Sequence, residues 1–363
     1  MSANTNTRNV CIITNGDSFL GFAIAYRMLQ AQKKREDNFA VEHKLRVLCR
    51  SRHGYGFNLL EEMGADVMEV DYKDEEKLRQ ALKDVRTVAL IPEKSHDSLK
   101  EAEHMIKVSH HHKVEFFCMH SMVGVDRIEE RQADEHHKYH NFMKLHKIEK
   151  MVKEHFHENH CIVRHSRFNQ YFYFMAPQIE GENMLALPVK ENAKWGCVDI
   201  NDVTNAIYKL ASMEHEGRGK KSSKMKKLYE FTPMHIMTSK EIAREIGVGL
   251  GREGLHFKEI SEHQMKEYLR RMRDDKRFKE RPVHHEQNWR EEIEKLERDG
   301  PWSFPLGKYL HDHAVEMMME GWHLANAGKQ DICTKDLKEI LNAEPRSVKE
   351  YFKKNRDNFK EFK

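Results

Sequence analysis

A polar turn between an apolar run and a helix-like segment carries the most informative spacing in the chain. Residues 10–13 are apolar, as in a buried parallel strand, and the segment FAIAYRMLQAQ after the turn has the spacing of a helix packed on a sheet. A dinucleotide-binding turn has glycines at three positions that this chain fills with Asn15, Ser18 and Gly21. Asn tolerates a left-handed turn, and Ser stays small where a pyrophosphate would approach. The spacing therefore predicts a weakened pyrophosphate site.

The start of the following helix adds to this prediction. Backbone N–H groups near Phe19 and Leu20 would face the phosphates, and the positive end of the helix dipole favours an anion there. The alternative is a strand-turn-helix unit that once bound a nucleotide and no longer does.

Two arginines follow the second apolar run, LRVLC at residues 45–49. Dinucleotide-binding folds place an acid at this point to bind ribose hydroxyls, or an arginine to meet a 2′-phosphate. The chain has Arg50 and Arg52 around Ser51, and a guanidinium can pair with a phosphate through two hydrogen bonds. The pattern favours NADP(H) over NAD(H), with a solvated basic loop as the alternative.

The histidines raise the question of a metal site. The chain has 25 of them, and His136 and His140 stand four residues apart on an expected helix. The segment HFHENH is not the H-E-x-x-H arrangement of zinc proteases, and no cysteine pair stands nearby. We therefore expect no metal, and we expect most histidines to lie on the surface, where they change charge between about pH 5 and pH 7.

Composition narrows the class of protein. With 363 residues the chain can bury a sizeable core, and its formal net charge of +3 argues against direct nucleic-acid binding. No apolar stretch is long enough to span a membrane. The six cysteines are scattered, mostly within apolar runs, as in a reduced, cytoplasmic protein. The basic segment at 218–227 is either a nuclear-entry segment or, as we expect, a solvated loop.

Strand and helix patterns alternate through the first half of the chain. Apolar runs at 10–13, 45–49, 66–70, 85–91, 114–119 and 161–164 are separated by helical patterns at 20–34, 55–63, 74–83, 97–109 and 138–156. This alternation predicts a Rossmann-like, doubly wound parallel sheet over residues 1–165, with 190–212 contributing. A helix within 190–212 is expected to be capped near Asn201 or Asp202. Residues 166–363 are expected to form a smaller α/β, largely helical subdomain, with a helix beginning at Thr238 or Ser239.

The order of these motifs resembles the NmrA-like family, atypical members of the short-chain dehydrogenase superfamily. The similar segments are TNGDSFLG, VLCRSRHG, VMEVDYKDEEKLRQAL, IEKMVKEHFHENHCIVRHSRFNQ and KWGCVDINDVTNAIYKL, and they run in order over nearly the whole chain. The resemblance implies that Asp71 lies beside the adenine and that Ile91 and Pro92 border the cofactor. It also implies a substrate-type subdomain after the nucleotide-binding part.

The same resemblance raises the question of catalysis. Typical short-chain dehydrogenases use a Tyr with a Lys four residues later on a helix, and no Tyr of this chain has one. Tyr139 has Lys144 at the fifth position, which turns away on a helix. Ser121 stands where the family has its catalytic or structural serine, and without a Tyr partner it is expected to cap or line the cleft. Ser121, Tyr139 and Lys144 are therefore weak catalytic candidates.

Aromatic residues mark the expected substrate pocket. Phe168, Asn169, Tyr171 and Trp195 lie where the family places that pocket, and an aromatic cleft would suit a planar ligand. Ordinary core packing is the alternative.

Three functions follow from these patterns. The leading one is an NADP(H)-binding, redox-sensing regulator or weak oxidoreductase. The others are an NADPH-dependent reductase of a small carbonyl or quinone, and a non-catalytic, self-assembling protein on a degenerate Rossmann scaffold. The low net charge and many histidines also favour a homo-oligomer, and a regulatory role implies a protein partner.

Overall fold

The computed structural model describes residues 8–53, 56–93, 95–129, 138–217, 225–279 and 306–360. The chain divides into two compact units. Unit 1 comprises Met1–Ser121, Lys144–Arg164 and Thr204–Tyr229, and unit 2 comprises Met122–Met143, His165–Val203 and Glu230–Lys363.

Most of unit 1 is built on a seven-stranded parallel sheet with the strand order β11-β6-β5-β4-β1-β2-β3. The strands are β1 (Val10–Ile13), β2 (Lys44–Cys49), β3 (Asp66–Glu69), β4 (Val85–Leu90), β5 (Phe116–Met122), β6 (His160–His165) and β11 (Leu228–Phe231). All four residues of β1 are buried, and Ile13 lies opposite Val47 on β2 and Ala89 on β4. The predicted Rossmann-like sheet is confirmed, and its order brings the carboxyl ends of β1, β2 and β4 together.

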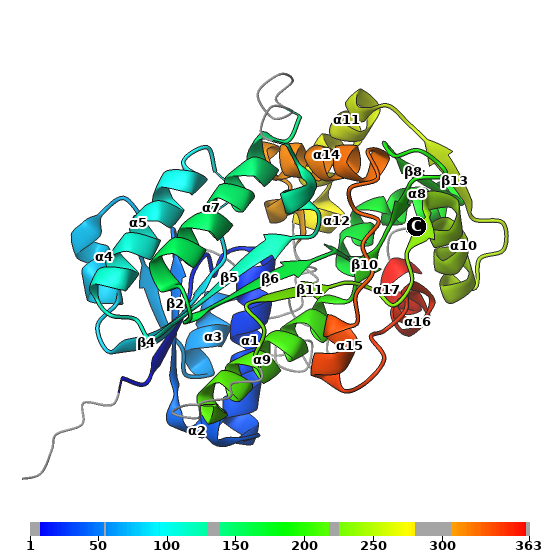
Figure 1. Ribbon diagram of the computed structural model, residues 1–363. Helices are drawn as coiled ribbons and strands as arrows, with labels where there is room; N and C mark the ends of the chain where they lie inside the picture. The colour runs from blue at the N-terminus through cyan, green and yellow to red at the C-terminus, as the bar shows by residue number, and fades with distance from the viewer. Residues whose placement is uncertain are drawn as a thin grey trace, which may run out of the picture. The chain divides into compact units, whose positions relative to one another are not determined.

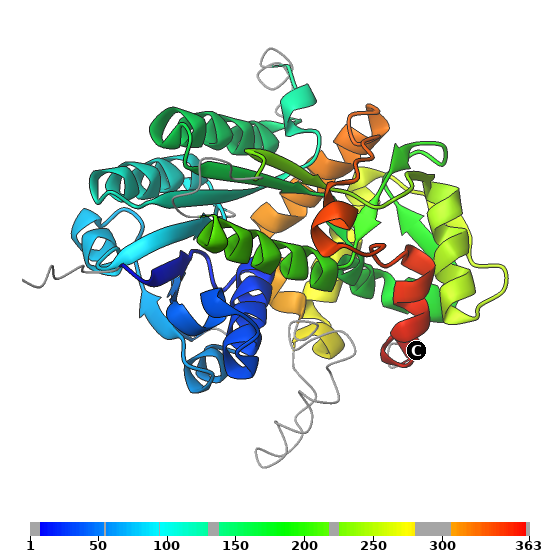
Figure 2. The same ribbon diagram turned by 60° about the horizontal axis from the view of Figure 1, so that its bottom comes forward.

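Helices cover both faces of this sheet. Figures 1 and 2 show α5 and α7 along one face and α1 and α9 along the other. The helices are α1 (Phe19–Lys34), α2 (Asn38–Glu42), α3 (Phe57–Glu62), α4 (Glu75–Ala81), α5 (Ser98–His111), α7 (His140–Phe156) and α9 (Ile200–Glu216). Such double coverage explains why the strands are continuous apolar runs rather than alternating ones.

Two of the predicted boundaries that differ from the structure do so for a clear local reason. The helix expected at 97–109 continues to His111, and the chain then turns through Lys113, whose φ is 57°. The Val114 N–H donates to the Ser109 carbonyl oxygen at 3.0 Å, so Val114 closes the helix instead of starting β5. At α9, the cap expected at Asn201 or Asp202 lies earlier, because Asp199 Oδ1 accepts from the Asn201 N–H at 2.9 Å.

The described part of unit 2 combines three two-stranded sheets with helices, which confirms the expected helix-rich C-terminal part. The pairs are β7 (Arg167–Phe168) with β10 (Cys197–Val198), β9 (Lys194–Trp195) with β12 (Met237–Thr238), and β8 (Met184–Leu187) with β13 (His256–Glu259). The helices are α8 (Ala176–Glu182), α10 (Ser239–Leu250), α11 (Glu262–Asp274), α12 (Lys276–Lys279), α14 (Asp312–Asn326), α15 (Asp336–Leu341), α16 (Val348–Lys354) and α17 (Arg356–Lys360), with 3-10 turns at Val125–Arg127, Asn169–Met175 and Leu306–Tyr309.

Helix α10 shows how the sequence sets these elements. Thr238 and Glu241 form a capping box at its start, as the sequence predicts. Near its end, a Cβ at Gly249 would lie 2.6 Å from the Lys349 carbonyl oxygen. Glycine therefore allows the close approach of α10 and α16 that both views show (Figures 1 and 2).

Candidate functional site

The turn between β1 and α1 keeps the close packing of a dinucleotide-binding turn. Asn15 takes a left-handed φ of 52°, the conformation expected from its position in the sequence. Ser18 caps α1, because its Oγ accepts from the Gly21 N–H at 3.0 Å and donates to the Asn15 carbonyl oxygen at 2.7 Å. A Cβ at Gly21 would lie 2.2 Å from that same carbonyl oxygen. Only glycine lets helix and turn approach this closely.

Neighbouring strand ends hold the turn in place. The Asn15 N–H donates to the Tyr72 hydroxyl at 2.9 Å. The Thr14 hydroxyl accepts from the Ile91 N–H at 2.9 Å and donates to the Ile91 carbonyl oxygen at 3.1 Å. The Asn15 amide nitrogen reaches the Pro92 carbonyl oxygen at 3.3 Å. The structure thus brings together the predicted cofactor residues Asn15, Ser18, Phe19, Leu20, Gly21, Ile91 and Pro92 at the carboxyl ends of β1 and β4.

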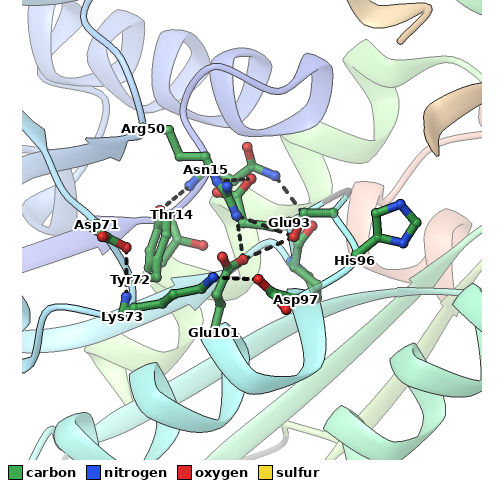
Figure 3. Close-up of polar contacts among 12 residues, drawn as sticks. Thr14, Asn15, Arg50, Asp71, Tyr72, Lys73, Glu93, His96, Asp97 and Glu101 are labelled. Atoms are coloured by element: carbon green, nitrogen blue, oxygen red, sulfur yellow. Dashed lines mark hydrogen bonds and ion pairs between the residues drawn. The ribbon is translucent and has the colours of Figure 1, made fainter. Parts of the chain in front are cut away.

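A cluster of carboxylates faces this turn, and the sequence analysis missed it. Figure 3 shows Arg50, Glu93 and Glu101 pointing toward one another beside Asn15. Arg50 Nε lies 3.1 Å from Glu93 Oε2, and Arg50 Nη2 donates to Glu101. The Glu93 and Glu101 side chains are only 11% and 5% exposed, so both carboxylates are largely removed from water. Arg50, expected to be open for a 2′-phosphate, is already in two ion pairs.

Burial changes the acidity of this cluster. Loss of water raises the pKa of the Glu93 carboxyl to about 8, against the opposing effect of Arg50, and the nearby Asp17 and Glu101 raise it further. With the Asn15 amide rotated by half a turn, its nitrogen donates to Glu93 Oε2 at 3.3 Å and to Asp17 Oδ1 at 3.2 Å.

Arg52 and Asp71 lie at the edge of this region. Arg52 is exposed, donates its N–H to Glu69 Oε2 at 3.0 Å, and pairs with Glu61 through its guanidinium. Asp71 is exposed, and its Oδ1 accepts from the Lys73 N–H at 3.0 Å.

These residues therefore fit one part of a dinucleotide and not another. The Ser18 cap, the Gly21 contact and the start of α1 fit a pyrophosphate. A 2′-phosphate does not fit Arg50 as it stands, because it would have to compete with Glu93 and Glu101 for the guanidinium.

The three weak catalytic candidates have separate surroundings. Ser121, at the end of the first segment of unit 1, is 2% exposed, and its hydroxyl has no hydrogen-bond partner among the described residues. Lys144, also in unit 1, donates to the His96 carbonyl oxygen at 3.0 Å. Tyr139 belongs to unit 2, where burial raises the pKa of its hydroxyl. The Lys144 ammonium is thus engaged with a backbone oxygen.

The expected substrate residues lie within unit 2. Phe168 stacks on His165 with ring centroids 4.5 Å apart, and Tyr171 stacks on Phe174 at 6.2 Å. The Trp195 Nε1 donates to Ser239 Oγ at 3.0 Å. Asn169 is fully buried, and both polar atoms of its amide lack a partner among the described residues. An amide in that state is costly unless something else satisfies it.

Arg167 lies beside Trp195, one of the expected substrate residues, and the sequence analysis missed it. Its Cζ lies 3.9 Å from the Trp322 ring centroid and 5.4 Å from that of Trp195. Its Nη1 donates to Gln330 at 2.6 Å, and burial lowers the pKa of the guanidinium to about 9. The position of Arg167 directly before Phe168 was the only clue in the sequence. Its contact with Trp322 could not be predicted, because Trp322 is far away in the sequence.

Metal-binding and membrane-spanning features were also sought in the described ranges. Those residues hold no group of three or more His, Cys, Asp or Glu side chains arranged to bind a metal ion. His136 and residues 218–224 of the basic segment lie outside the described residues. None of the described helices is long and apolar enough to cross a membrane.

Comparison with known proteins gives structural relatives of low identity. A triphenylmethane reductase from Citrobacter sp., complexed with NADP(H), matches with a TM-score of 0.64 at 12% identity, covering 95% of this chain and 99% of that one. An NADPH-dependent quinone oxidoreductase from Escherichia coli, complexed with NADPH, matches with a TM-score of 0.61 at 15% identity, covering 94% and 98%. A nucleoside-diphosphate-sugar epimerase from Staphylococcus aureus matches with a TM-score of 0.62 at 15% identity, covering 95% and 99%. At these identities the likeness concerns the fold.

Sequence comparison is more specific about the family. No curated protein matches the chain. The model of the NmrA-like family matches residues 29–301, well over half of the sequence, beginning after the β1–α1 turn. With the resemblance in motif order and the Rossmann-like sheet, this match shows that the chain belongs to the NmrA-like family.

Proposed function

We propose that the protein binds a nicotinamide dinucleotide at the β1–α1 turn and acts as a redox-sensing regulator, with little or no reductase turnover. The observation that carries the proposal is the contact between Gly21 and the Asn15 carbonyl oxygen, where a Cβ would lie 2.2 Å away. Such packing shapes the turn so that its protein backbone can approach the pyrophosphate of a dinucleotide closely. Ser18 caps α1, and the N-terminus of this helix therefore lies at the same turn.

Family and neighbours support the ligand class. Two of the similar structures contain NADP(H) or NADPH, although at 12% and 15% identity. The ion pairs of Arg50 with Glu93 and Glu101 weaken the expected preference for the 2′-phosphate. We therefore propose a dinucleotide site in which NADP(H) gains less from Arg50 than the sequence alone suggests.

The missing acid–base pair supports low turnover. No Tyr of the chain has a Lys at the fourth following position, and the Lys144 Nζ is engaged by the His96 carbonyl oxygen. A hydride-transfer enzyme of the typical short-chain type needs that Tyr to exchange a proton. A regulator needs only binding.

Two other functions remain as candidates. The Glu101 carboxylate beside Arg50 would repel a nucleotide phosphate, and this favours a non-catalytic scaffold. The likeness to a quinone oxidoreductase favours a reductase of a small carbonyl or quinone.

Fluorescence titration of the full chain with NADPH and NADH separates the three functions. Saturable binding without NADPH oxidation, in the presence of a quinone or a small aldehyde, supports the proposal. Absence of binding of either nucleotide contradicts it and favours the scaffold, and rapid oxidation of NADPH contradicts it in favour of the reductase.

A matched pair of glycine variants places the binding at the turn. Gly21→Ala puts a methyl group against the Asn15 carbonyl oxygen, whereas Gly181→Ala adds one where nothing lies within 4 Å. We expect Gly21→Ala to lose binding and Gly181→Ala to keep it, with circular dichroism checking that both are folded. Equal binding by two folded variants would place the nucleotide elsewhere.

A further inference from the structure

Three cysteines on the central sheet of unit 1 line one internal cavity. Cys11 on β1, Cys118 on β5 and Cys161 on β6 border a space of about 40 Å³ whose other walls are mostly apolar. Cys11 and Cys161 are buried, and Cys118 is partly exposed. A water molecule needs only about 10–15 Å³ of such space, so a small polar molecule fits beside the thiols.

Strand geometry places Cys118 beside Cys161. Strands β5 and β6 are neighbours in the sheet, and the Phe117 N–H donates to the Asn159 carbonyl oxygen at 3.0 Å. In a parallel pair this register sets Cys118 opposite Cys161, with both side chains on the same face. The neighbouring Cys161 thiol lowers the pKa of the Cys118 thiol. Adjacent strands are about 4.8 Å apart, within the range of Cα separations that a disulfide spans.

His120 completes the cluster. It lies two residues after Cys118 on β5, so the two side chains share a face of the strand. Its charge lowers the pKa of the Cys118 thiol, and neither of its ring nitrogens has a hydrogen-bond partner among the described residues. An imidazole beside a thiol favours the thiolate, which is the nucleophilic form.

Two other buried cysteines show the effect of burial without such partners. Burial raises the pKa of the Cys49 and Cys197 thiols to about 12. For Cys118, the neighbouring Cys161 thiol and the charge of His120 outweigh burial and lower the pKa of the thiol. The cluster, and not burial, distinguishes Cys118.

We propose that Cys118 and Cys161 form a peroxide-reactive dithiol, with hydrogen peroxide or a small hydroperoxide as the oxidant that enters the cavity. The Cys118 thiolate attacks the terminal peroxide oxygen, the O–O bond breaks, and the second oxygen takes up a proton and leaves as water from hydrogen peroxide or as the alcohol from a hydroperoxide. The Cys161 sulfur then attacks the Cys118 sulfenic acid, forms the S–S bond and releases water. Two thiols are oxidised, one peroxide is reduced, and a thiol reductant reverses the change. This inference is independent of nucleotide binding.

Peptide mass mapping of the peroxide-treated full chain tests the proposal. The background is Cys333→Ser, because Cys333 is exposed and would react first. At low peroxide dose we expect one disulfide between Cys118 and Cys161, which dithiothreitol reduces, while Cys49 and Cys197 stay open to alkylation after denaturation. Free thiols at both Cys118 and Cys161 would overturn the proposal, and so would oxidation of all buried cysteines at the same dose.

Single variants test the order of the two steps. In Cys161→Ser we expect a Cys118 sulfenic acid that dimedone captures, and in Cys118→Ser we expect no oxidation of Cys161. Oxidation of Cys161 alone in folded Cys118→Ser would contradict the assigned nucleophile. If either variant fails to fold, the mapping of the Cys333→Ser chain still decides the proposal, because it leaves Cys118 and Cys161 in place.

Discussion

The pairing of Arg50 controls how its charge can be used. Its guanidinium meets Glu93 and Glu101, two carboxylates that are largely buried. An incoming 2′-phosphate gains little from a guanidinium that already pairs with Glu101 and lies against Glu93. Nucleotide preference at this site therefore depends on the carboxylates as much as on the arginine.

Glu101→Gln should strengthen NADP⁺ binding relative to NAD⁺. The variant removes one negative charge from Arg50, and we expect a gain of about tenfold in the affinity ratio, or ~1.4 kcal/mol. Calorimetric titration with both nucleotides measures this ratio. Glu103→Gln is the control, because Glu103 pairs with Lys107 on the same helix. An unchanged ratio in Glu101→Gln would mean that Arg50 does not meet the 2′-phosphate.

Glu93 should make stability fall as the pH rises. Its pKa in the folded chain is about 8 against an ordinary 4.5, so the fold favours the protonated form. The favourable contribution is complete below about pH 4.5 and is lost as pH rises through about 8, by at most ~1.4 kcal/mol per pH unit. Glu93→Gln should therefore gain stability over the wild type between pH 5 and pH 9. Urea unfolding of both proteins across that range measures the difference, and parallel profiles would contradict the assignment.

Local chemistry was predictable from the sequence at this site, but long-range pairing was not. Asn15, Ser18 and Gly21 follow from the spacing of one turn. Glu93 lies in the loop after β4, and Glu101 lies in the first turn of α5. Only the strand order 3-2-1-4 brings these two residues to Arg50. Nothing local marks a carboxylate that will meet a cation more than forty residues away in the sequence.

At the scale of elements, a buried ion pair joins α7 to β6. Arg164 Nε lies 2.9 Å from Glu149 Oε1, and Arg164 Nη2 lies 2.7 Å from Glu149 Oε2. The side chains of Glu149 and Arg164 are 0% and 3% exposed. Each charge is therefore held away from water and depends on the other.

Glu149→Gln should destabilise the fold by about 3–5 kcal/mol, because it leaves the Arg164 charge buried without its counter-charge. Urea unfolding measures the loss. Glu154→Gln is the control, on an exposed position of the same helix. Replacing both partners, as Glu149→Leu with Arg164→Met, should recover much of the stability. A loss below 1 kcal/mol in Glu149→Gln would show that water reaches the pair.

The elements that could be predicted were those with a continuous apolar run or a clear helical spacing of apolar residues. Strand β1 has the bounds that the sequence predicts, and α1 differs by one residue. The two-residue strands β7, β9, β10 and β12 were not predicted, because two residues are too few to show a period. Their pairing depends on tertiary contacts within unit 2.

At the scale of the whole molecule, charge near neutrality is low and histidines are many. The formal net charge is +3 with His neutral, and there are 25 His. His43, His120, His160, His165 and His313 are buried. Burial lowers the pKa of His160, while exposed histidines such as His104, His110 and His111 are open to water. Contrary to the expectation for most histidines, these five do not face solvent. The histidines on the surface are the ones that can add positive charge to the molecule in acid.

We predict self-association, at least to a dimer, that is favoured near neutral pH and weakened by acid. Near pH 7 little net charge keeps copies apart, whereas below about pH 6 the exposed histidines take up protons and net charge rises steeply. Light scattering from about pH 5.5 to about pH 8 at fixed salt measures the mass of the particle. Repeating the acid measurement at high salt is the control, because screening should restore association if charge repulsion breaks it. A monodisperse monomer at every pH would show that the histidines only decorate the surface.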